Sequence, residues 1–226
     1  MKLKLLMFAL TQRPIQDPTG SLTSLPNGTP AMRLNLKLYA PGELDDQDTE
    51  ALWQLLVAAD NEFVPSLSSR GDTTTKRLVT DTSSSRDGPR KYFNDTQSQW
   101  IIFGLINQRV VGMMSFIPHY NADILGDWSP CSYLSTLIVD KSYRRSGVAR
   151  RLYGYLIDYS RKIGDVAVGT RTWSTNVGHL ALLDDLGFVP AKTIPDHRAP
   201  GVDTIYFARP AMTSERSLKS CKASLE

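Results

Sequence analysis

Residues 133–149 read YLSTLIVDKSYRRSGVA, and this stretch decides the fold. Its first part, 133–139, is short, apolar and rich in β-branched and aromatic residues, which is typical of a buried strand. An apolar stripe then begins at Val148 and recurs every three or four residues, through Leu152, Leu156, Tyr159 and Ile163. The sequence therefore predicts a strand, a loop and an amphipathic helix, in that order.

The start of this helix is densely cationic. It carries four arginines, Arg144, Arg145, Arg150 and Arg151. The helix dipole favours acids at this end, yet no acid occurs in the helix before Asp158. The charge makes sense if an anion binds to free backbone N–H groups and guanidinium groups here; the alternative is a basic helix start that faces solvent. The glycine patterns of a Rossmann turn and of a P-loop are both absent.

A second strand and helix follow. Residues 166–170 are predicted to form a strand, and 177–186 a helix that begins after Asn176 and ends at Gly187, with Phe188 next. Together with the hexapeptide at 144–149, which fits R/Q-x-x-G-x-G/A, these features resemble the GCN5-related N-acetyltransferase (GNAT) superfamily. In that family the hexapeptide forms the pyrophosphate-binding loop, and the resemblance covers roughly residues 32–209.

The resemblance implies an α/β (α+β) fold, with a mixed, mostly antiparallel central sheet flanked by helices and with splayed fourth and fifth strands. It implies acetyl-CoA as co-substrate and no metal, with a backbone N–H of Leu137 or Ile138 aimed at the thioester oxygen. The residues implied to bind acetyl-CoA are Leu137, Ile138, Val139, Arg144, Arg145, Ser146, Gly147, Val148, Ala149, Arg150 and Asn176. Asn176 is equally suited to be a plain helix N-cap.

The sequence does not fix the residues that move protons. An alkylamine has a pKa of about 10.4, so a base or a desolvating pocket must supply its neutral form. Tyr133 stands where several relatives place a catalytic glutamate, and Leu183 stands where many carry the tyrosine that protonates the leaving thiolate. Candidate catalytic residues are Tyr133, Glu62 and His119, with Asp123 as a further candidate base. Candidate aromatic walls for an acceptor pocket are Tyr120, Trp128 and Trp173.

Composition limits the class of protein. With 226 residues, 41% of them hydrophobic, the chain is long enough for one buried core, and its net charge of +3 is too small to imply nucleic acid. Two distant cysteines, Cys131 and Cys221, fit a reducing cytoplasm without disulfides or a zinc site. No apolar run is long enough to span a membrane, and the short one in residues 1–10 lacks the features of a signal peptide.

We expect three parts: an N-terminal extension at 1–31, an acetyltransferase domain at 32–209 and a polar C-terminal tail at 210–226. Within the domain, further strands are expected at 32–39, 100–106, 109–117, 191–194 and 204–208. Residues 196–201 would interrupt the last pair of strands. Further helices are expected after the acids at 45–48 and from Pro89, placed at the first helical position, to about Gln97.

The predicted function is transfer of an acetyl group from acetyl-CoA to a primary amine of a small molecule, peptide or protein, by direct attack in a ternary complex. The alternative is a non-catalytic acyl-CoA-binding regulator, which Leu183 and Tyr133 favour. A nucleic-acid-binding module fits less well, because the basic residues are confined to one helix start. The family often forms dimers, so a homodimer is a further expectation.

Overall fold

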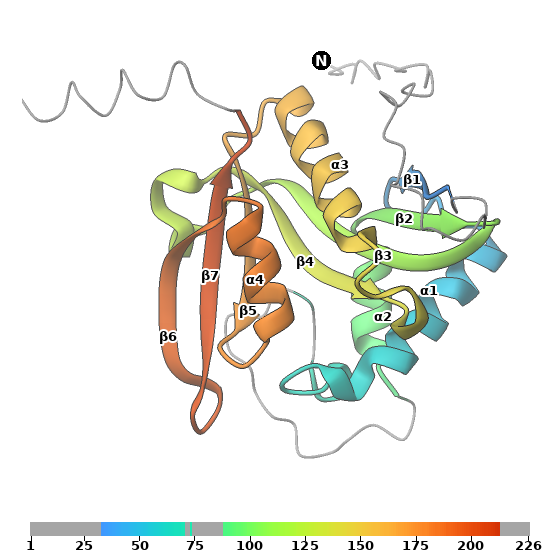
Figure 1. The fold of residues 1–226 in the computed structure, drawn as a ribbon, viewed down its shortest axis with the longest axis horizontal. Coiled ribbons are helices and arrows are strands. Elements are labelled where there is room, and N and C mark those ends of the chain that lie inside the picture. The colour runs from blue at the N-terminus through green and yellow to red at the C-terminus, as the bar shows by residue number, and fades with distance from the viewer. Residues whose placement is uncertain (1–32, 71–72, 74–87, 213–226) are drawn as a thin grey trace, which may run out of the picture. The chain divides into compact units, whose positions relative to one another are not determined.

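The structure is a computed structural model, and it describes residues 33–70, 73 and 88–212 (Figure 1). The chain divides into two units, and the second of them, Leu34–Glu226, contains every element described below. The strands are β1 (Asn35–Tyr39), β2 (Trp100–Ile106), β3 (Arg109–Tyr120), β4 (Cys131–Val139), β5 (Ala167–Trp173), β6 (Val189–Ala199) and β7 (Val202–Pro210). The α-helices are α1 (Asp46–Ala59), α2 (Arg90–Gln97), α3 (Val148–Ile163) and α4 (Val177–Asp185). Short 3₁₀ elements are η1 (Asp60–Glu62), η2 (Leu67–Ser69), η3 (Asp123–Trp128) and η4 (Lys141–Tyr143).

All of these strands form one sheet, in the order β1-β2-β3-β4-β5-β7-β6. Neighbouring strands are antiparallel except β4 and β5, which run parallel. The parallel pairing is confined to residues 131–133 against 167–169, and beyond it the two strands part. Ser135 is an extra residue in β4 opposite the step from Ser115 to Phe116, so β4 carries a bulge where it leaves β5. The predicted mixed, mostly antiparallel sheet with splayed fourth and fifth strands is confirmed.

Helices cover both faces of the sheet (Figure 1). α3 and α4 pack on one face, where Leu152 and Leu156 of α3 join Met114 in the larger apolar core. α1 and α2 pack on the other face, where Leu52 of α1 joins Met113. Met113 and Met114 point to opposite faces because successive side chains of a strand alternate.

The start of α3 lies where the sequence predicts it. Gly147 is the N-cap residue of α3, with φ of 86°, and the first turn of the helix contains no acid. The stripe is buried at Val148, Leu152 and Leu156, which fixes the rotation of the helix against the sheet. The predicted amphipathic helix is thereby confirmed. Its cationic start lies near the point where β4 and β5 separate.

Several element boundaries differ from those predicted. β1 begins at Asn35 rather than at residue 32, and α2 begins at Arg90, with Pro89 as its N-cap rather than its first helical residue. β3 continues past residue 117 to Tyr120 because a register shift and a positive φ at His119 (51°) accommodate the proline before it. The expected interruption at 196–201 is instead a register shift and a tight turn inside a longer β6–β7 hairpin.

The predicted N-terminal extension at 1–31, most of the tail at 210–226 and most of the polar segment before α2 lie outside the described residues. Among the helices that the structure describes, none is long and apolar enough to cross a membrane.

Candidate functional site

A cavity of about 600 Å³ lies where β4 and β5 separate. The start of α3 and its preceding loop form one end, and α4 forms a side wall. η1 and β5 complete the lining. The lining residues include Glu62, Phe63, Leu134, Ser135, Leu137, Ile138, Val139, Arg144, Arg145, Gly147, Val148, Ala149, Arg150, Arg171, Trp173, Asn176 and His179. Of the residues predicted to bind acetyl-CoA, all but Ser146 line this cavity; Ser146 Oγ instead donates a hydrogen bond to the Tyr143 carbonyl at 2.5 Å.

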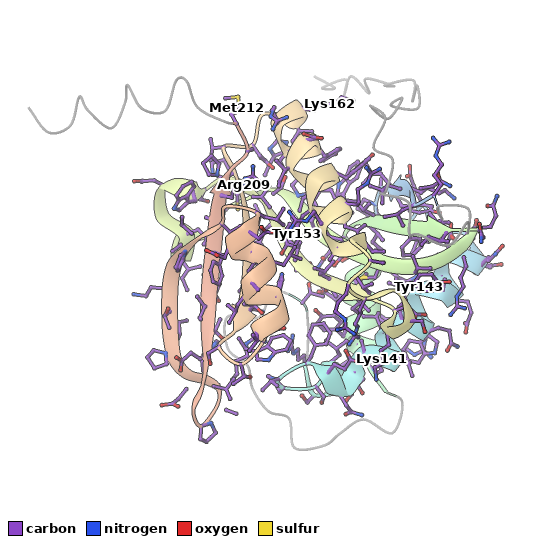
Figure 2. The ribbon with its side chains drawn as sticks, in the orientation of Figure 1. Lys141, Tyr143, Tyr153, Lys162, Arg209 and Met212 are labelled. Carbon is purple, nitrogen blue, oxygen red and sulfur yellow. The ribbon has the colours of Figure 1, made fainter. Side chains whose placement is uncertain are left out.

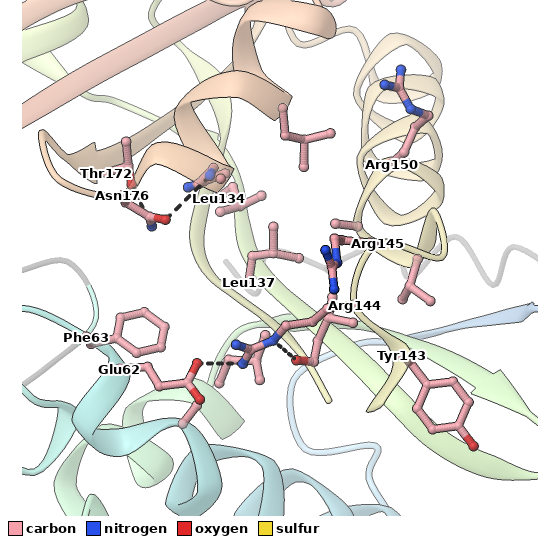
Figure 3. Close-up of a pocket in the computed structure, with 18 of the residues that line it drawn as sticks. Glu62, Phe63, Leu134, Leu137, Tyr143, Arg144, Arg145, Arg150, Thr172 and Asn176 are labelled. Atoms are coloured by element: carbon pink, nitrogen blue, oxygen red, sulfur yellow. Dashed lines mark hydrogen bonds and ion pairs between the residues drawn. The ribbon is translucent and has the colours of Figure 1, made fainter. Parts of the chain in front are cut away.

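The loop before α3 presents backbone N–H groups at the cationic end of the cavity. Arg145 (φ 61°) and Gly147 (φ 86°) both adopt left-handed backbone conformations, which turn the chain tightly into the helix. The N–H groups in the first turn of a helix have no intrahelical partner, and the α3 first turn has no acid to accept from them. Arg145 projects beside these groups, and Arg150 adds a charge farther along α3 (Figure 3). The arrangement offers several donors and positive charges to one anion.

Two of the arginines at the start of α3 and in the loop before it already pair with carboxylates from other elements. Arg150 pairs with Asp185 at the end of α4, an ion pair with both side chains more than half exposed. Arg144 pairs with Glu62 at 2.5 Å, and its Nε also donates to the Val139 carbonyl at 3.1 Å (Figure 3). Because the Arg150–Asp185 pair is exposed and such pairs contribute little to stability, an incoming phosphate can replace Asp185 at small cost.

Glu62 lies across the cavity from α3. Besides Arg144, its carboxylate meets Lys141 at 3.1 Å. Burial by itself would raise the pKa of Glu62, but the hydrogen bonds and charges of Arg144 and Lys141 outweigh it and hold the pKa below its ordinary value. While these cations remain paired with it, Glu62 is an ionised and weakly basic carboxylate.

The bulged part of β4 forms the floor of the cavity. Leu137, Ile138 and Val139 line it, and from residue 134 onward their strand has no ladder partner on the β5 side. Backbone polar groups at such an edge are available to an extended ligand that carries amides. This geometry fits the role expected for these residues, which stays a prediction.

Asn176 caps α4 at the side of the cavity. Its Oδ1 accepts from the His179 N–H at 3.4 Å, and its Nδ2 donates to Thr172 Oγ1 at 3.2 Å. The helix-cap role is therefore present, and the same residue lines the cavity. Both readings of Asn176 are compatible with this position.

His179 is a cavity residue that the sequence reasoning did not single out. It lies one turn before Leu183 on α4, and its Nε2 is 2.7 Å from Tyr153 Oη of α3, which Figure 2 marks. Burial lowers the pKa of His179 to about 4, so the imidazole is neutral at pH 7. Leu183 itself is fully buried in the core. The sequence did contain a signal for His179: it lies four residues before Leu183, and residues four apart share one face of a helix.

Two predicted catalytic residues lie outside the cavity lining. Tyr133 is buried in a separate cluster, with its ring 5.1 Å from that of Tyr120, and burial raises its pKa far above the neutral range. His119 lies at the end of β3, where its Nδ1 is 2.7 Å from the buried carboxylate of Asp165. Tyr120 and Trp128 pack at the edge of the Tyr133 cluster, whereas Trp173, the third aromatic candidate, does line the cavity.

The part of the cavity that Phe63 and β5 line is aromatic and cationic. Phe63 and Trp173 pack together in a tilted arrangement, with ring centroids 5.6 Å apart. Arg171 is two residues before Trp173 on β5 and therefore lies on the same face of the strand. Arg171 donates to Tyr206 Oη at 3.3 Å and to the Thr73 carbonyl at 3.2 Å. From the sequence, the alternation of side chains along β5 could show only that Arg171 and Trp173 share a face of the strand. It could not show that Phe63 packs against that face.

Comparisons with known proteins agree with this geometry. The model of the acetyltransferase (GNAT) family matches residues 69–188, which include the whole α3 loop and the Asn176 cap. No curated protein sequence matches the chain.

Solved structures share the fold at low sequence identity. One is yncA from Salmonella typhimurium, solved with acetyl-CoA, at 17% identity and a TM-score of 0.53, covering 80% of this chain and 96% of that one. Another is an aminoglycoside 6′-N-acetyltransferase complexed with coenzyme A, at 15% identity and a TM-score of 0.53, covering 79% of this chain and 98% of that one. A third is the ribosomal-protein-alanine N-acetyltransferase from Brucella melitensis, at 16% identity and a TM-score of 0.52, covering 77% of this chain and 99% of that one. At these identities the likeness shows the fold alone.

Proposed function

The chain belongs to the acetyltransferase (GNAT) family, and on that premise we propose that it transfers an acetyl group from acetyl-CoA to a primary amine by direct attack in a ternary complex. The observation that carries the proposal is the continuity of one cavity. It connects an anion-binding helix start to the opening between β4 and β5. We assign this activity to the domain at residues 32–209, with 1–31 and 210–226 as flanking segments.

Donor binding uses the cationic end and the floor of the cavity. The pyrophosphate lies on the N–H groups of the α3 loop, beside Arg145 and Arg150. The pantetheine arm pairs with the free edge of β4 at Leu137 and Val139, and a β4 N–H polarises the thioester carbonyl. This placement directs the acetyl group toward the end of the cavity that Phe63 and Trp173 line.

The chemical step forms one bond and breaks one. The neutral amine nitrogen attacks the thioester carbon, an N–C bond forms, the C–S bond breaks, and the sulfur leaves as the coenzyme A thiolate. The proton that the amine loses passes to a base, and the thiolate takes up a proton. Holding both substrates in one cavity supplies much of the rate increase, because it converts a bimolecular reaction into an effectively unimolecular one.

Glu62 is the residue that we assign as the base. It is the candidate from the sequence whose carboxylate lines the cavity. In the free protein Arg144 and Lys141 keep it weakly basic. When the donor phosphates draw these cations away, the pKa of Glu62 rises, which makes the carboxylate a better base only once acetyl-CoA is bound.

The thiolate leaves next to α4. Leu183 cannot protonate it, so His179 takes this place on the same helix face. A neutral imidazole can donate one N–H hydrogen bond to the departing sulfur, with Tyr153 fixing its orientation. Solvent then completes the protonation.

Release of coenzyme A with a panel of amines tests the proposal, with calorimetry of acetyl-CoA binding run in parallel. We expect acetyl-CoA to bind and amines to release thiol. Glu62→Gln should lower kcat about 100-fold or more at neutral pH, whereas Glu50→Gln, at an exposed position of α1, should leave kcat unchanged. Binding without thiol release for any amine would instead favour the non-catalytic acyl-CoA-binding regulator. Absence of binding would refute both.

A further inference from the structure

Three arginines from distant parts of the chain meet behind the aromatic end of the cavity. Arg70 follows η2, Arg171 belongs to β5 and Arg198 belongs to β6. Arg70 and Arg198 are only 8% and 5% exposed. Burying even one cation is costly, so two buried arginines beside the partly buried Arg171 are unusual.

The partners of Arg70 and Arg198 are neutral oxygens. Arg70 donates to the carbonyls of Val64 at 3.1 Å and Pro65 at 3.0 Å. Arg198 donates to the same Val64 carbonyl at 2.9 Å and to Thr204 Oγ1 at 3.0 Å. Within residues 33–70, 73 and 88–212, no carboxylate forms an ion pair with Arg70 or Arg198.

The three guanidinium groups also repel one another. Burial lowers the pKa of Arg198 to about 9, and the charges of Arg70 and Arg171 act in the same direction. Burial lowers the pKa of Arg70 as well, and Arg171 again adds to the effect. Arginine stays charged at neutral pH, so Arg70 and Arg198, which have no carboxylate partner among the described residues, produce a concentrated positive potential beside Arg171.

This potential reaches the cavity at a defined place. Arg171 lines the cavity directly, and Arg198 stacks on Trp173 with its guanidinium carbon 5.4 Å from the ring centroid. Arg70 stacks on Phe63 at 5.3 Å. The aromatic pair that lines this part of the cavity therefore has cations behind it.

We propose that the acceptor is a primary amine that also carries a carboxylate, of the size of an amino acid with an apolar side chain. Its carboxylate binds Arg171, while Arg70 and Arg198 add charge and hold the Val64 segment in place. Its apolar part packs against the cavity-facing sides of Phe63 and Trp173. The proposal rests on the proposed function, and it narrows the acceptor from any amine to an anionic one.

Matched acceptors test the proposal. L-phenylalanine, L-phenylalaninamide and phenethylamine differ in whether they carry a carboxylate, and L-leucine, L-leucinamide and isoamylamine repeat the comparison. We expect kcat/KM for the amino acid to exceed that of its amide and its decarboxylated amine by about 10- to 100-fold, the usual value of a charge-assisted pair. The amide has the less basic amine, so protonation of the amine cannot produce this preference.

A binding assay tests the anion site without turnover. Calorimetry compares 3-phenylpropionate with 3-phenylpropionamide on the protein saturated with coenzyme A. We expect only the carboxylate to bind, Arg171→Gln to remove that binding, and Arg171→Lys to retain part of it. Arg33→Gln, at an exposed position, is the matched control and should bind like the wild type. The thermal shift with acetyl-CoA confirms that each variant is folded.

The outcomes separate the two proposals. Equal binding or equal reaction of carboxylate and carboxamide would overturn the anionic acceptor, and so would identical behaviour of Arg171→Gln and Arg33→Gln. Binding of 3-phenylpropionate without thiol release from any amine would refute the transferase and leave the anion site standing.

Discussion

Replacing Gly147 by Asp should separate the folding of α3 from the binding of acetyl-CoA. Gly147 is exposed, and a Cβ added to it would meet nothing within 4 Å, so the new side chain has room. Its φ of 86° costs a non-glycine residue about 1 kcal/mol, and Asp is among the residues that tolerate this conformation best. A carboxylate at a helix start returns about 0.3–1 kcal/mol through the dipole. The net change in the free energy of unfolding should therefore be below about 1 kcal/mol.

Binding should change much more. At an effective dielectric constant of about 40 and a separation of about 7 Å, one phosphate charge repels the new carboxylate by about 1.2 kcal/mol. Two pyrophosphate charges double this, and physiological salt reduces the sum to about 1–2 kcal/mol. The dissociation constant of acetyl-CoA should then rise about 5- to 30-fold, at 1.4 kcal/mol per tenfold change.

Gly147→Asn is the matched control, because it has the same shape and backbone strain without the charge. Calorimetry with acetyl-CoA at two salt concentrations measures both variants, and chemical denaturation measures their stability. We expect Asn to bind almost like Gly, and the difference between Asp and Asn to shrink at high salt. Equal dissociation constants for Asp and Asn would refute the placement of the pyrophosphate at this loop.

Three further predictions concern stability. The lowered pKa of Glu62 means that its ion pairs stabilise the fold above the ordinary carboxyl pKa and lose this effect as pH falls through the lower folded value. Glu62→Gln should therefore cost about 0.5–1 kcal/mol in urea unfolding at pH 7 and progressively less as the pH falls below the ordinary carboxyl pKa; a cost that does not change with pH would contradict this. The pKa of His179 is also lowered, so this side chain binds a proton more readily in the unfolded chain than in the folded one. As the pH falls from 6.5 to about 4, the wild type should therefore lose more stability than His179→Gln. Parallel pH profiles of stability for the two proteins would contradict this. Leu152→Ala empties a fully buried position and should cost about 2–5 kcal/mol in thermal unfolding, whereas Val177→Ala, 73% exposed, should stay within about 0.5 kcal/mol; similar losses for both would contradict the assigned core.

The element boundaries show where local patterns mislead. The sequence pattern predicted that the strand from residue 109 ends at residue 117, yet β3 runs past Pro118, which lacks a backbone N–H, to Tyr120. The register shift there and the positive φ of His119 let the strand pass the proline without losing its partner. Neighbouring strands decide such extensions, because a bulge depends on what lies opposite.

For the functional residues, too, local sequence patterns were not enough and the tertiary structure decided the outcome. Glu62 was one of several equal candidates, and only folding placed its carboxylate against Arg144, 82 positions later in the sequence. His119 and Tyr133 were equally plausible from their residue types, but β3 and β4 direct them toward Asp165 and Tyr120. A titratable side chain carries no local signal of which cavity it will line.

The sequence by itself determined the strand, the loop and the cationic helix start of residues 133–163, because periodicity, glycine geometry and the helix dipole all act within a few residues of one another. Only the tertiary structure decided what faces that helix start and what the far end of the cavity contains. The Val64 carbonyl meets Arg198, 134 positions away, and Arg171 reaches Thr73, 98 positions away. Such contacts are set by the packing of the sheet and its loops, and no short-range pattern of the chain records them.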